Sequence, residues 1–209
     1  MRSWWWVMEK RKQMALVFII VTMILQFQMK GCVGCVESER MGLLQLKSYL
    51  NSLLSPKEDE SILDSWSDEN PKSDCCNWER VNCSDSIGGH IINLSLGGIT
   101  FSWNEDQPLG LNLSLLHSFP QLKTFDFSEN QFDHLFDPIY VLKNMPKLQE
   151  LDLSVNKFTD IDERGLVFPP SLQVLDLHDN HLSFTHKGYS KICRLINLRE
   201  LDLSNNALT

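Results

Sequence analysis

The residues most able to perform chemistry are two histidines near position 180. The run His178-Asp179-Asn180-His181 offers imidazole and carboxylate groups of the kinds that bind zinc. Its spacing matches the strand and turn of a repeat that recurs along the chain, so we expect surface histidines and no metal site. The sequence has no nucleophile elbow, no phosphate-binding glycine loop and no helical metal motif. We therefore predict a protein that is not an enzyme and needs no cofactor.

A second set of reactive side chains is an early cluster of four cysteines: Cys35, Cys75, Cys76 and Cys83. Zinc is the competing explanation for such a cluster. The adjacent pair lacks the two-residue spacing with which two thiolates hold one tetrahedral ion, and no histidine lies among the four. We therefore expect two disulfides, for which four cysteines allow three connectivities.

The first 34 residues have the layout of a secretory signal peptide. Three basic residues, Lys10–Lys12, precede an uncharged apolar stretch from Met14 to Phe27. This stretch is shorter than the run of about 20 residues that a membrane-spanning helix needs, which argues against the alternative of an uncleaved signal anchor. The small residues Gly31 and Gly34 favour cleavage near Gly34, so that the mature chain begins at Cys35.

Secretion agrees with the disulfides and with three Asn-x-Ser acceptor sites for N-glycosylation, at Asn82, Asn93 and Asn112. We expect a secreted protein, or one on the extracellular side of the plasma membrane. Without residues 1–34 the chain keeps 14 basic and 26 acidic residues, a net charge of −12. Such a surface repels nucleic acid and anionic membranes, so neither is an expected partner.

Five segments repeat the pattern Leu-x-x-Leu-x-Leu-x-x-Asn-x-Leu or a close variant. The four clearest copies begin at Leu122, Leu148, Leu172 and Leu198. Their asparagines are Asn130, Asn156, Asn180 and Asn206. The spacings of 26, 24 and 26 residues fall within the repeat length of roughly 20–29 residues that is typical of leucine-rich repeats. A degenerate first copy begins at Ile91, and Ile99 replaces its asparagine. The Leu-x-Leu step would place neighbouring leucines about 200° apart on a helix, which argues against an amphipathic helix.

Each repeat predicts a short strand whose side chains alternate between two faces, with Leu151 and Leu153 inward and Asp152 outward. Each coil holds half a core, which is completed when the next coil stacks on it. The repeat asparagines would satisfy backbone groups that lack ladder partners at the strand ends. The predicted fold is α/β, a right-handed leucine-rich-repeat solenoid with one parallel sheet. Cys193 would pack as a small apolar residue beneath the convex side, opposite the sheet.

Ligand binding is expected on the outward face of the sheet. The expected ligand-facing residues are Asp126, Gln149, Glu150, Asp152, Asp176, His178, Arg199 and Asp202. Four of them are aspartates at one repeat position. They would form an acidic ladder for a cationic ligand, or they follow the repeat consensus, which is the interpretation that we favour. A glycan on Asn93, which falls on the same face of the first coil, would shift binding to later repeats.

Residues before the repeats predict a lid for the stack. Leu43 and Leu46 belong to a group of leucines at helical spacing, and Ser38 is available to cap the start of this helix. Trp66 and Trp78 could fill the space between the helix and the first coil. The first coil would thus be covered on its outer side.

Three motifs mark this lid: Cys35-x-x-x-Glu39-Arg40-x-x-Leu43-Leu44-x-Leu46-Lys47, Asp64-Ser65-Trp66 and Asp74-Cys75-Cys76-x-Trp78-x-x-Val81-x-Cys83. Together they resemble the N-terminal cap of plant leucine-rich-repeat proteins, and most closely that of the cell-surface receptor-like proteins. The resemblance implies that Cys35 pairs with Cys75 and Cys76 with Cys83. Plant-type repeats usually continue with Gly-x-Ile-Pro after the asparagine segment. Residues 157–161 and 181–184 lack it, so the second sheet of the family is doubtful in these coils.

The resemblance implies an extracellular receptor-like protein that binds a peptide or protein ligand in cell-surface signalling or defence, together with a co-receptor kinase. One alternative is a secreted inhibitor of a cell-wall-degrading enzyme, like the polygalacturonase inhibitors, and another is a truncated product without independent function. The expected domains are a signal peptide at 1–34, the cap at 35–85 and about five repeats at 86–209. Because the chain stops at Thr209 directly after a repeat, we expect a truncated protein that contacts the membrane only through a missing C-terminal span.

Overall fold

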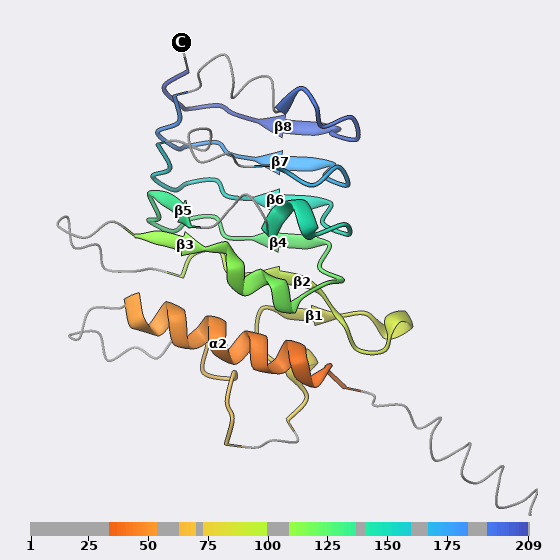
Figure 1. The fold of residues 1–209 in the computed structure, drawn as a ribbon. Coiled ribbons are helices and arrows are strands. Elements are labelled where there is room, and N and C mark those ends of the chain that lie inside the picture. The colour runs from red at the N-terminus through yellow and green to blue at the C-terminus, as the bar shows by residue number, and fades with distance from the viewer. Residues whose placement is uncertain are drawn as a thin grey trace, which may run out of the picture. The chain divides into compact units, whose positions relative to one another are not determined.

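The described part of the chain is a stack of coils closed at one end by a helix (Figure 1). The computed structural model of the 209-residue chain describes residues 34–53, 63–69, 73–99, 109–136, 141–159, 167–183 and 192–208. The predicted signal peptide, apart from Gly34, lies outside these residues. Within them no helix combines the length and the apolar character needed to span a membrane.

The helix α2 (Glu37–Leu53) forms the lid. Its buried face carries leucines that are at most 1% exposed: Leu43, Leu46 and Leu50. The helix begins after Val36, whose carbonyl accepts hydrogen bonds from the amides of Glu39 and Arg40 at 2.9 Å. The expectation that Ser38 caps this helix is therefore wrong, because the helix begins one residue earlier and Ser38 lies in its first turn.

The lid packs against η3 (Leu113–Ser118), a 3-10 helix on the return path of the first coil. Gly42 permits the close approach, because a Cβ atom built there would lie 2.3 Å from the Cβ of Ser118 and 3.3 Å from the ring of Phe119. A separation of 2.3 Å is far below any real contact between carbon atoms. The missing side chain therefore sets how closely the lid approaches the first coil.

Two disulfides tie the cap together, one joining Cys35 to Cys75 and the other joining Cys76 to Cys83. This is the pairing that the resemblance implies. The first bridge closes a separation of 40 residues, which restrains the unfolded chain by about 4 kcal/mol. Trp66 and Trp78 stack with their ring centroids 6.2 Å apart and are 1% and 5% exposed. The two rings thus form the aromatic part of the continuous core at the cap end, next to the short helix η1 (Cys75–Asn77).

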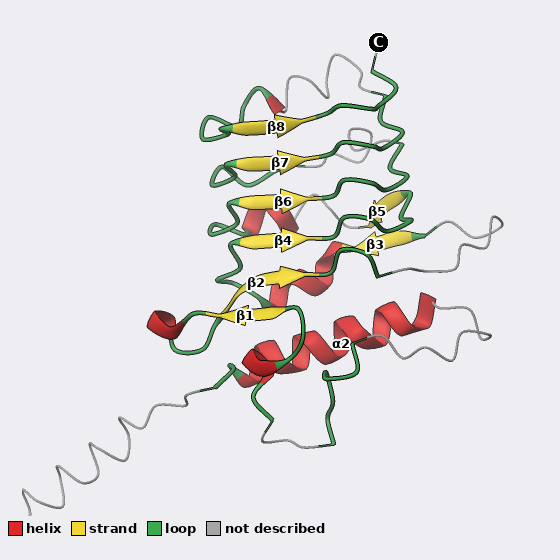
Figure 2. Cartoon of the chain, turned by 180° about the vertical axis from the view of Figure 1, so that it is seen from behind, coloured by secondary structure: helices red, strands yellow, loops and turns green. Residues whose placement is uncertain are grey.

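Six strands form the main sheet, in the order β1-β2-β4-β6-β7-β8 (Figure 2). Their bounds are β1 (Val81–Cys83), β2 (Ile91–Ser95), β4 (Thr124–Asp126), β6 (Glu150–Asp152), β7 (Val174–Asp176) and β8 (Glu200–Asp202). All neighbours are parallel except β1 and β2, which are antiparallel and are joined through η2 (Asp85–Ile87). This series of parallel strands confirms the predicted leucine-rich-repeat solenoid.

A second, two-stranded sheet accompanies the first coils. It pairs β3 (Gly110–Asn112) with β5 (His134–Phe136) in parallel. In the later coils, residues 157–159 and 181–183 form no strand. The sequence analysis did not predict the β3–β5 pair or the antiparallel strand β1, because neither carries the repeat pattern.

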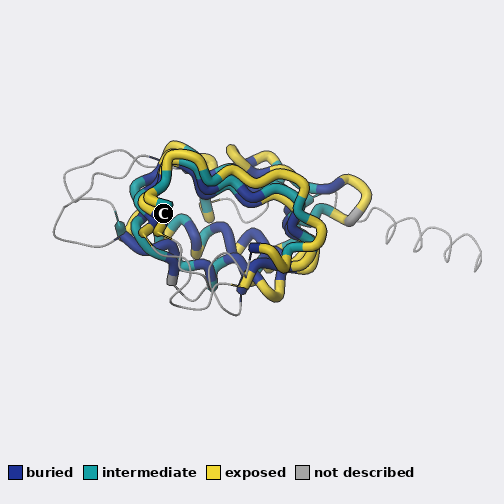
Figure 3. Tube along the Cα trace, turned by 90° about the horizontal axis from the view of Figure 1, so that it is seen from above, coloured by how far each residue is buried: buried dark blue, intermediate teal, exposed yellow. Residues whose placement is uncertain are grey.

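The core lies inside the coils, between the main sheet and the return segments (Figure 3). Some return segments form short helices, such as η4 (Leu142–Asn144). One inward residue of each strand is paired in register with that of the next: Leu94, Phe125, Leu151, Leu175 and Leu201. The first four are at most 1% exposed, whereas Leu201 on the edge strand β8 is 41% exposed. Complete burial of such a side chain stabilises a fold by about 1.5–3 kcal/mol, so stacking supplies much of the stability of each coil.

Candidate functional site

The outward side chains of β4, β6, β7 and β8, together with the residues just after each strand, form one surface, which we call the sheet face. Four aspartates stand in register along it: Asp126, Asp152, Asp176 and Asp202. The first three are half-buried and the last is exposed. The fold therefore aligns the four aspartates that share one repeat position in the sequence.

Each of these aspartates closes the turn that follows its strand. Its Oδ1 accepts a hydrogen bond at 2.8–3.0 Å from the amide two residues further on, which belongs to Ser128, Ser154, His178 or Ser204. The hydroxyls of Ser128 and Ser154 add second hydrogen bonds to Oδ1 at 2.7 and 2.6 Å. These local donors offset the repulsion between successive carboxylates. The ladder thus has a structural role in the repeat, whatever it binds.

The turn donors also affect the ionisation of the last aspartate. The Ser204 hydroxyl, the Ser204 amide and nearby His178 together lower the pKa of Asp202 below its ordinary value of 3.8. Around His178, the hydrogen bond that the imidazole donates to Asp176 and the charges of Asp176, Asp179 and Asp202 raise the imidazole pKa above 6.5. The end of the sheet face near β8 therefore combines a carboxylate of lowered pKa, Asp202, with a histidine of raised pKa, His178.

Two columns beside the aspartates differ from coil to coil. One column, in register across the sheet, is Thr124, Glu150, Val174 and Glu200. The other follows the strands and is Glu129, Val155, Asp179 and Asn205. All four members of the second column have a left-handed backbone, with φ between 49° and 54°. This conformation is rare for residues other than glycine, and the sequence analysis did not foresee it. The two columns give each coil a different outward chemistry on the same scaffold.

Gln149 and Arg199 are separated from the aspartates, since each lies just before its strand. They line a hollow of about 460 Å³, whose other lining residues are Ser171, Gln173, Ile196, Asn197 and Leu198. The structure therefore divides the eight expected ligand-facing residues into two groups. Six lie on the sheet face, and two lie beside this hollow at the start of the strands.

The repeat asparagines tie each coil to the preceding one. Asn130, Asn156 and Asn180 are 4–5% exposed, and Asn206 is half-buried. Asn156 shows the pattern: its Nδ2 donates to the carbonyls of Phe127 at 3.0 Å, Leu153 at 3.2 Å and Ser154 at 3.0 Å. Its Oδ1 accepts from the amide of Phe132 at 3.1 Å. One side chain thus satisfies backbone groups of two coils, as the repeat pattern suggested.

The glycosylation acceptor sites lie near the cap. Asn82 and Asn93 are paired directly opposite each other on β1 and β2, with Asn82 exposed and Asn93 half-buried. Asn112 precedes η3, and its Oδ1 accepts hydrogen bonds from the amide of Ser114 at 3.0 Å and from the Ser114 hydroxyl at 2.6 Å. Asn82 and Asn93 therefore mark the cap end of the main sheet.

Two buried charges that the sequence alone did not identify hold the lid in place: Glu39 joins it to β2, and Arg40 joins it to the segment of the cap that contains Asp68. Glu39 is fully buried, and its carboxylate accepts from the amide of Ile91 at 2.7 Å and contacts Nδ1 of His90 at 2.7 Å. Arg40, only 3% exposed, forms an ion pair with Asp68 at 2.7 Å. Both residues belong to the cap motif, but their spacing alone does not reveal these partners.

Cys193 is exposed, so the expectation that it packs under the convex side is wrong. Its neighbour Ile192 is 8% exposed and occupies the inward position of this return segment. Adjacent residues of the turn point in different directions, and the larger apolar side chain is the one that enters the core.

Comparisons with known proteins agree with this architecture. A family model for the leucine-rich-repeat N-terminal domain matches residues 36–84, and leucine-rich-repeat models match 120–182, 171–194 and 197–209. Receptor-like protein 1 of Arabidopsis thaliana is 43% identical over 215 residues, covering 100% of this chain and 20% of that protein. Receptor-like protein 9a of the same plant is 37% identical over 194 residues, covering 91% of this chain and 19% of its own length. The chain thus spans about a fifth of the length of these relatives.

Solved plant ectodomains share the fold. The BIR2 ectodomain of Arabidopsis thaliana has a TM-score of 0.57 at 22% identity, over 85% of this chain and 83% of that one. A chain in the BIR3–SERK2 complex from Arabidopsis thaliana has a TM-score of 0.55 at 30% identity, and the match covers 80% of this chain and 82% of that one. The fold and the sheet face define a leucine-rich-repeat module. By its cap and its repeats, the chain belongs to the plant leucine-rich-repeat receptor-like proteins, the family that the cap motifs indicated.

Proposed function

We propose that this chain is the cap-proximal part of an extracellular receptor-like protein that binds a peptide or protein ligand on its sheet face. The proposal rests on one observation: the two columns of the sheet face vary from coil to coil, although the turns beside them are closed by the same aspartate hydrogen bond. Such an arrangement can change its recognition chemistry without changing the fold. The named relatives are receptor-like proteins, and this chain corresponds to about a fifth of their length.

A co-receptor kinase is part of the proposal on the ground of solved complexes that share this fold. The BIR3–SERK2 structure, 30% identical to this chain, is a complex of two proteins. The same fold occurs in the receptor kinase HAESA, whose structure contains the peptide hormone IDA and the co-receptor SERK1, with a TM-score of 0.51. These complexes support the proposal that this chain binds a ligand together with a partner ectodomain.

Export and glycosylation are proposed on the sequence signals, namely the signal-peptide layout and the three acceptor sites. Glycans on Asn82 or Asn93 would occupy the cap end of the main sheet and leave β4 to β8 for the ligand. Peptide mapping of the secreted chain before and after glycosidase treatment tests this. Unmodified Asn82 and Asn93 would remove the proposed shielding of the first coil.

Ligand binding is tested with the secreted full chain and a displayed library of random peptides. Peptides selected on the wild-type chain are then measured against Glu150→Lys and Glu200→Lys, two exposed changes in one column of the sheet face. We expect each change to weaken binding of selected peptides about tenfold or more, because a central charge is reversed. Lys143→Glu, an exposed charge reversal in η4 on the opposite side, serves as the matched control.

Peptides that bind both column variants as tightly as the wild type, or that lose binding only to Lys143→Glu, would contradict recognition on the sheet face. Direct inhibition of a polygalacturonase by the secreted chain would instead favour the inhibitor function. The two outcomes are distinguishable because enzyme inhibition requires no peptide selection.

A further inference from the structure

His178 departs from its column for no reason that the fold supplies. The residue two places after each ladder aspartate is serine in three coils and His178 in the fourth. Ser128 and Ser154 already provide the hydroxyl donor that the turn uses, at 2.7 and 2.6 Å. In the β7 coil, Nδ1 of His178 takes that place at 2.7 Å from Oδ1 of Asp176. The imidazole therefore adds a nitrogen ligand that the turn itself does not require.

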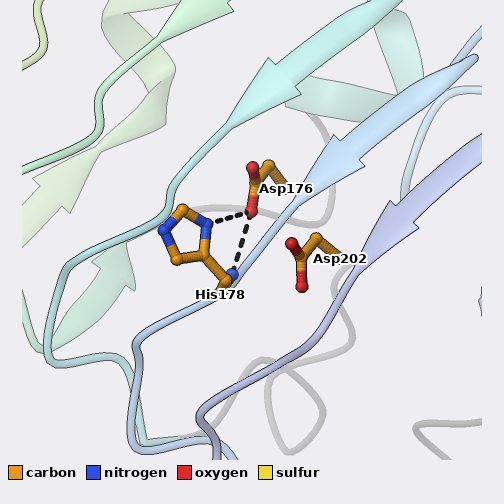
Figure 4. A group of neighbouring side chains, drawn as sticks. All are labelled: Asp176, His178 and Asp202. Carbon is orange, nitrogen blue, oxygen red and sulfur yellow. Dashed lines mark hydrogen bonds and ion pairs between the residues drawn. The ribbon is translucent and has the colours of Figure 1, made fainter.

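Stacking brings a second carboxylate to this imidazole. Asp176 on β7 and Asp202 on β8 are in register, although Asp202 is 24 residues away from His178 in the chain. One ligand atom from each of Asp176, His178 and Asp202 lies within 4.8 Å of the other two. Figure 4 shows the imidazole and both carboxylates side by side at the ends of the two strands. The side chains of His178 and Asp176 are 31% and 29% exposed, so an ion can reach them from solvent.

We propose that Asp176, His178 and Asp202 form a binding site for a divalent transition-metal ion, represented by Zn²⁺. Imidazole and carboxylate are ligands that zinc accepts, and three of them leave a fourth position for water or for a group of a bound ligand. The nitrogen ligand disfavours Ca²⁺ and Mg²⁺, which bind through oxygen. No metal site was expected from the run His178 to His181, because both aspartates of the proposed site lie outside that run.

The geometry requires only small side-chain movements. Two ligands bound tetrahedrally to one zinc ion at about 2.0–2.1 Å lie roughly 3.3 Å apart. The ion would replace the proton between His178 and Asp176, whose contact opens from 2.7 Å. Asp202 closes inward from its present position within 4.8 Å. The proposal is independent of the peptide ligand proposed above, since the three side chains alone define the site.

The repeat supplies matched variants. His178→Ser gives the β7 coil the Asp-x-Ser turn of its neighbours, so the turn keeps its hydroxyl donor while the site loses its nitrogen ligand. Ser128→His transfers the arrangement two coils back, where Asp126 and Asp152 are also in register and where Ser128 is half-buried like His178. Asp202→Asn removes a proposed ligand, and Asp126→Asn removes an aspartate of the same ladder two coils away from His178.

The experiment is calorimetric titration of the full secreted chain with Zn²⁺ at neutral pH, with circular dichroism to establish that each variant is folded. We expect His178→Ser and Asp202→Asn to weaken Zn²⁺ binding by about tenfold or more, and Asp126→Asn to leave it unchanged. Ca²⁺ should not compete, and Ser128→His should add Zn²⁺ binding to a chain that also carries His178→Ser.

The site is refuted if the wild type binds no Zn²⁺ or if His178→Ser binds it as tightly as the wild type. Equal weakening in Asp126→Asn and Asp202→Asn would also overturn the proposal, because it would show that the general acidity of the ladder is responsible. Failure of Ser128→His to add binding would show that two aligned aspartates and a histidine are insufficient, which contradicts the geometric basis of the proposal.

Discussion

Single polar side chains decide how well the backbone of each coil is satisfied. The repeat asparagines bond to backbone groups of two coils, and the ladder aspartates close the turns of their own coil. Glu39 does the same for the lid, because it accepts the amide of Ile91 in a fully buried position. A buried polar group without such a partner is costly, so these side chains are more sensitive to substitution than the exposed residues around them.

We predict that Asn156→Leu lowers the free energy of unfolding by at least about 2 kcal/mol, because it removes the buried hydrogen bonds of Asn156 to the carbonyls of Phe127 and Leu153 and to the amide of Phe132. Urea denaturation of the secreted chain measures this loss. Asn206→Leu is the control and should cost less, since Asn206 is half-buried and water can replace its bonds. Equal losses in the two variants would show that the buried bonds are not the cause.

A second prediction concerns His178 in metal-free protein. Since Asp176 raises the pKa of His178 above 6.5, an NMR titration in the presence of a chelator should find the imidazole titrating above that value. The substitution Asp176→Asn should lower the pKa of His178 toward its ordinary value. The folded state binds this proton more tightly than the unfolded state, so the stabilisation is complete below pH 6.5 and is lost as pH rises through the raised pKa. An unchanged titration in Asp176→Asn would exclude the carboxylate as the cause.

Among the elements, the contact between α2 and η3 depends on a missing side chain. Alanine is favoured over glycine by about 1 kcal/mol inside a helix, so Gly42→Ala would stabilise an isolated helix. In the folded protein its Cβ would lie 2.3 Å from the Cβ of Ser118, and the lid would have to move. The tertiary contact therefore outweighs the helix propensity of the residue.

We expect Gly42→Ala to lower the thermal midpoint of the secreted chain, and Ser118→Gly in the same chain to restore part of the loss by removing the opposing Cβ atom. Differential scanning calorimetry of the two single variants and the double variant measures this coupling. Additive effects in the double variant would argue against the contact.

In the whole molecule, stability comes from coils that complete one another. Leu151 and Leu201 occupy the same repeat position, but Leu151 is 1% exposed and Leu201 is 41% exposed on the edge strand. The same residue type in the same local pattern therefore differs in burial only because of its place in the stack.

Leu151→Ala should cost about 2–5 kcal/mol, as expected for a leucine deleted from a core. Leu201→Ala should cost less than half as much, because its side chain is already in contact with water. Chemical denaturation of both variants under the same conditions provides the comparison. Similar costs would mean that the edge coil is as well packed as the interior coils.

The repeat pattern determined the strands, the inward residues and the buried asparagines, because the alternation of side chains along a strand is a local property. The cap motifs indicated the lid and, through the family resemblance, the disulfide pairing. They did not reveal the partners of Glu39 and Arg40 or the clearance needed at Gly42, since those contacts join segments that are far apart in the chain.

The stacking of the coils determines which residues of different coils become neighbours, and the spacing of residues within one repeat does not predict these contacts. Stacking placed Asp202 beside His178, separated Gln149 and Arg199 from the aspartates, and left Cys193 outside while Ile192 entered the core. The register between coils follows from strand pairing, which joins residues 24 or 26 positions apart in the chain. The scaffold could therefore be predicted from the amino-acid sequence, whereas the chemistry between coils required the tertiary structure.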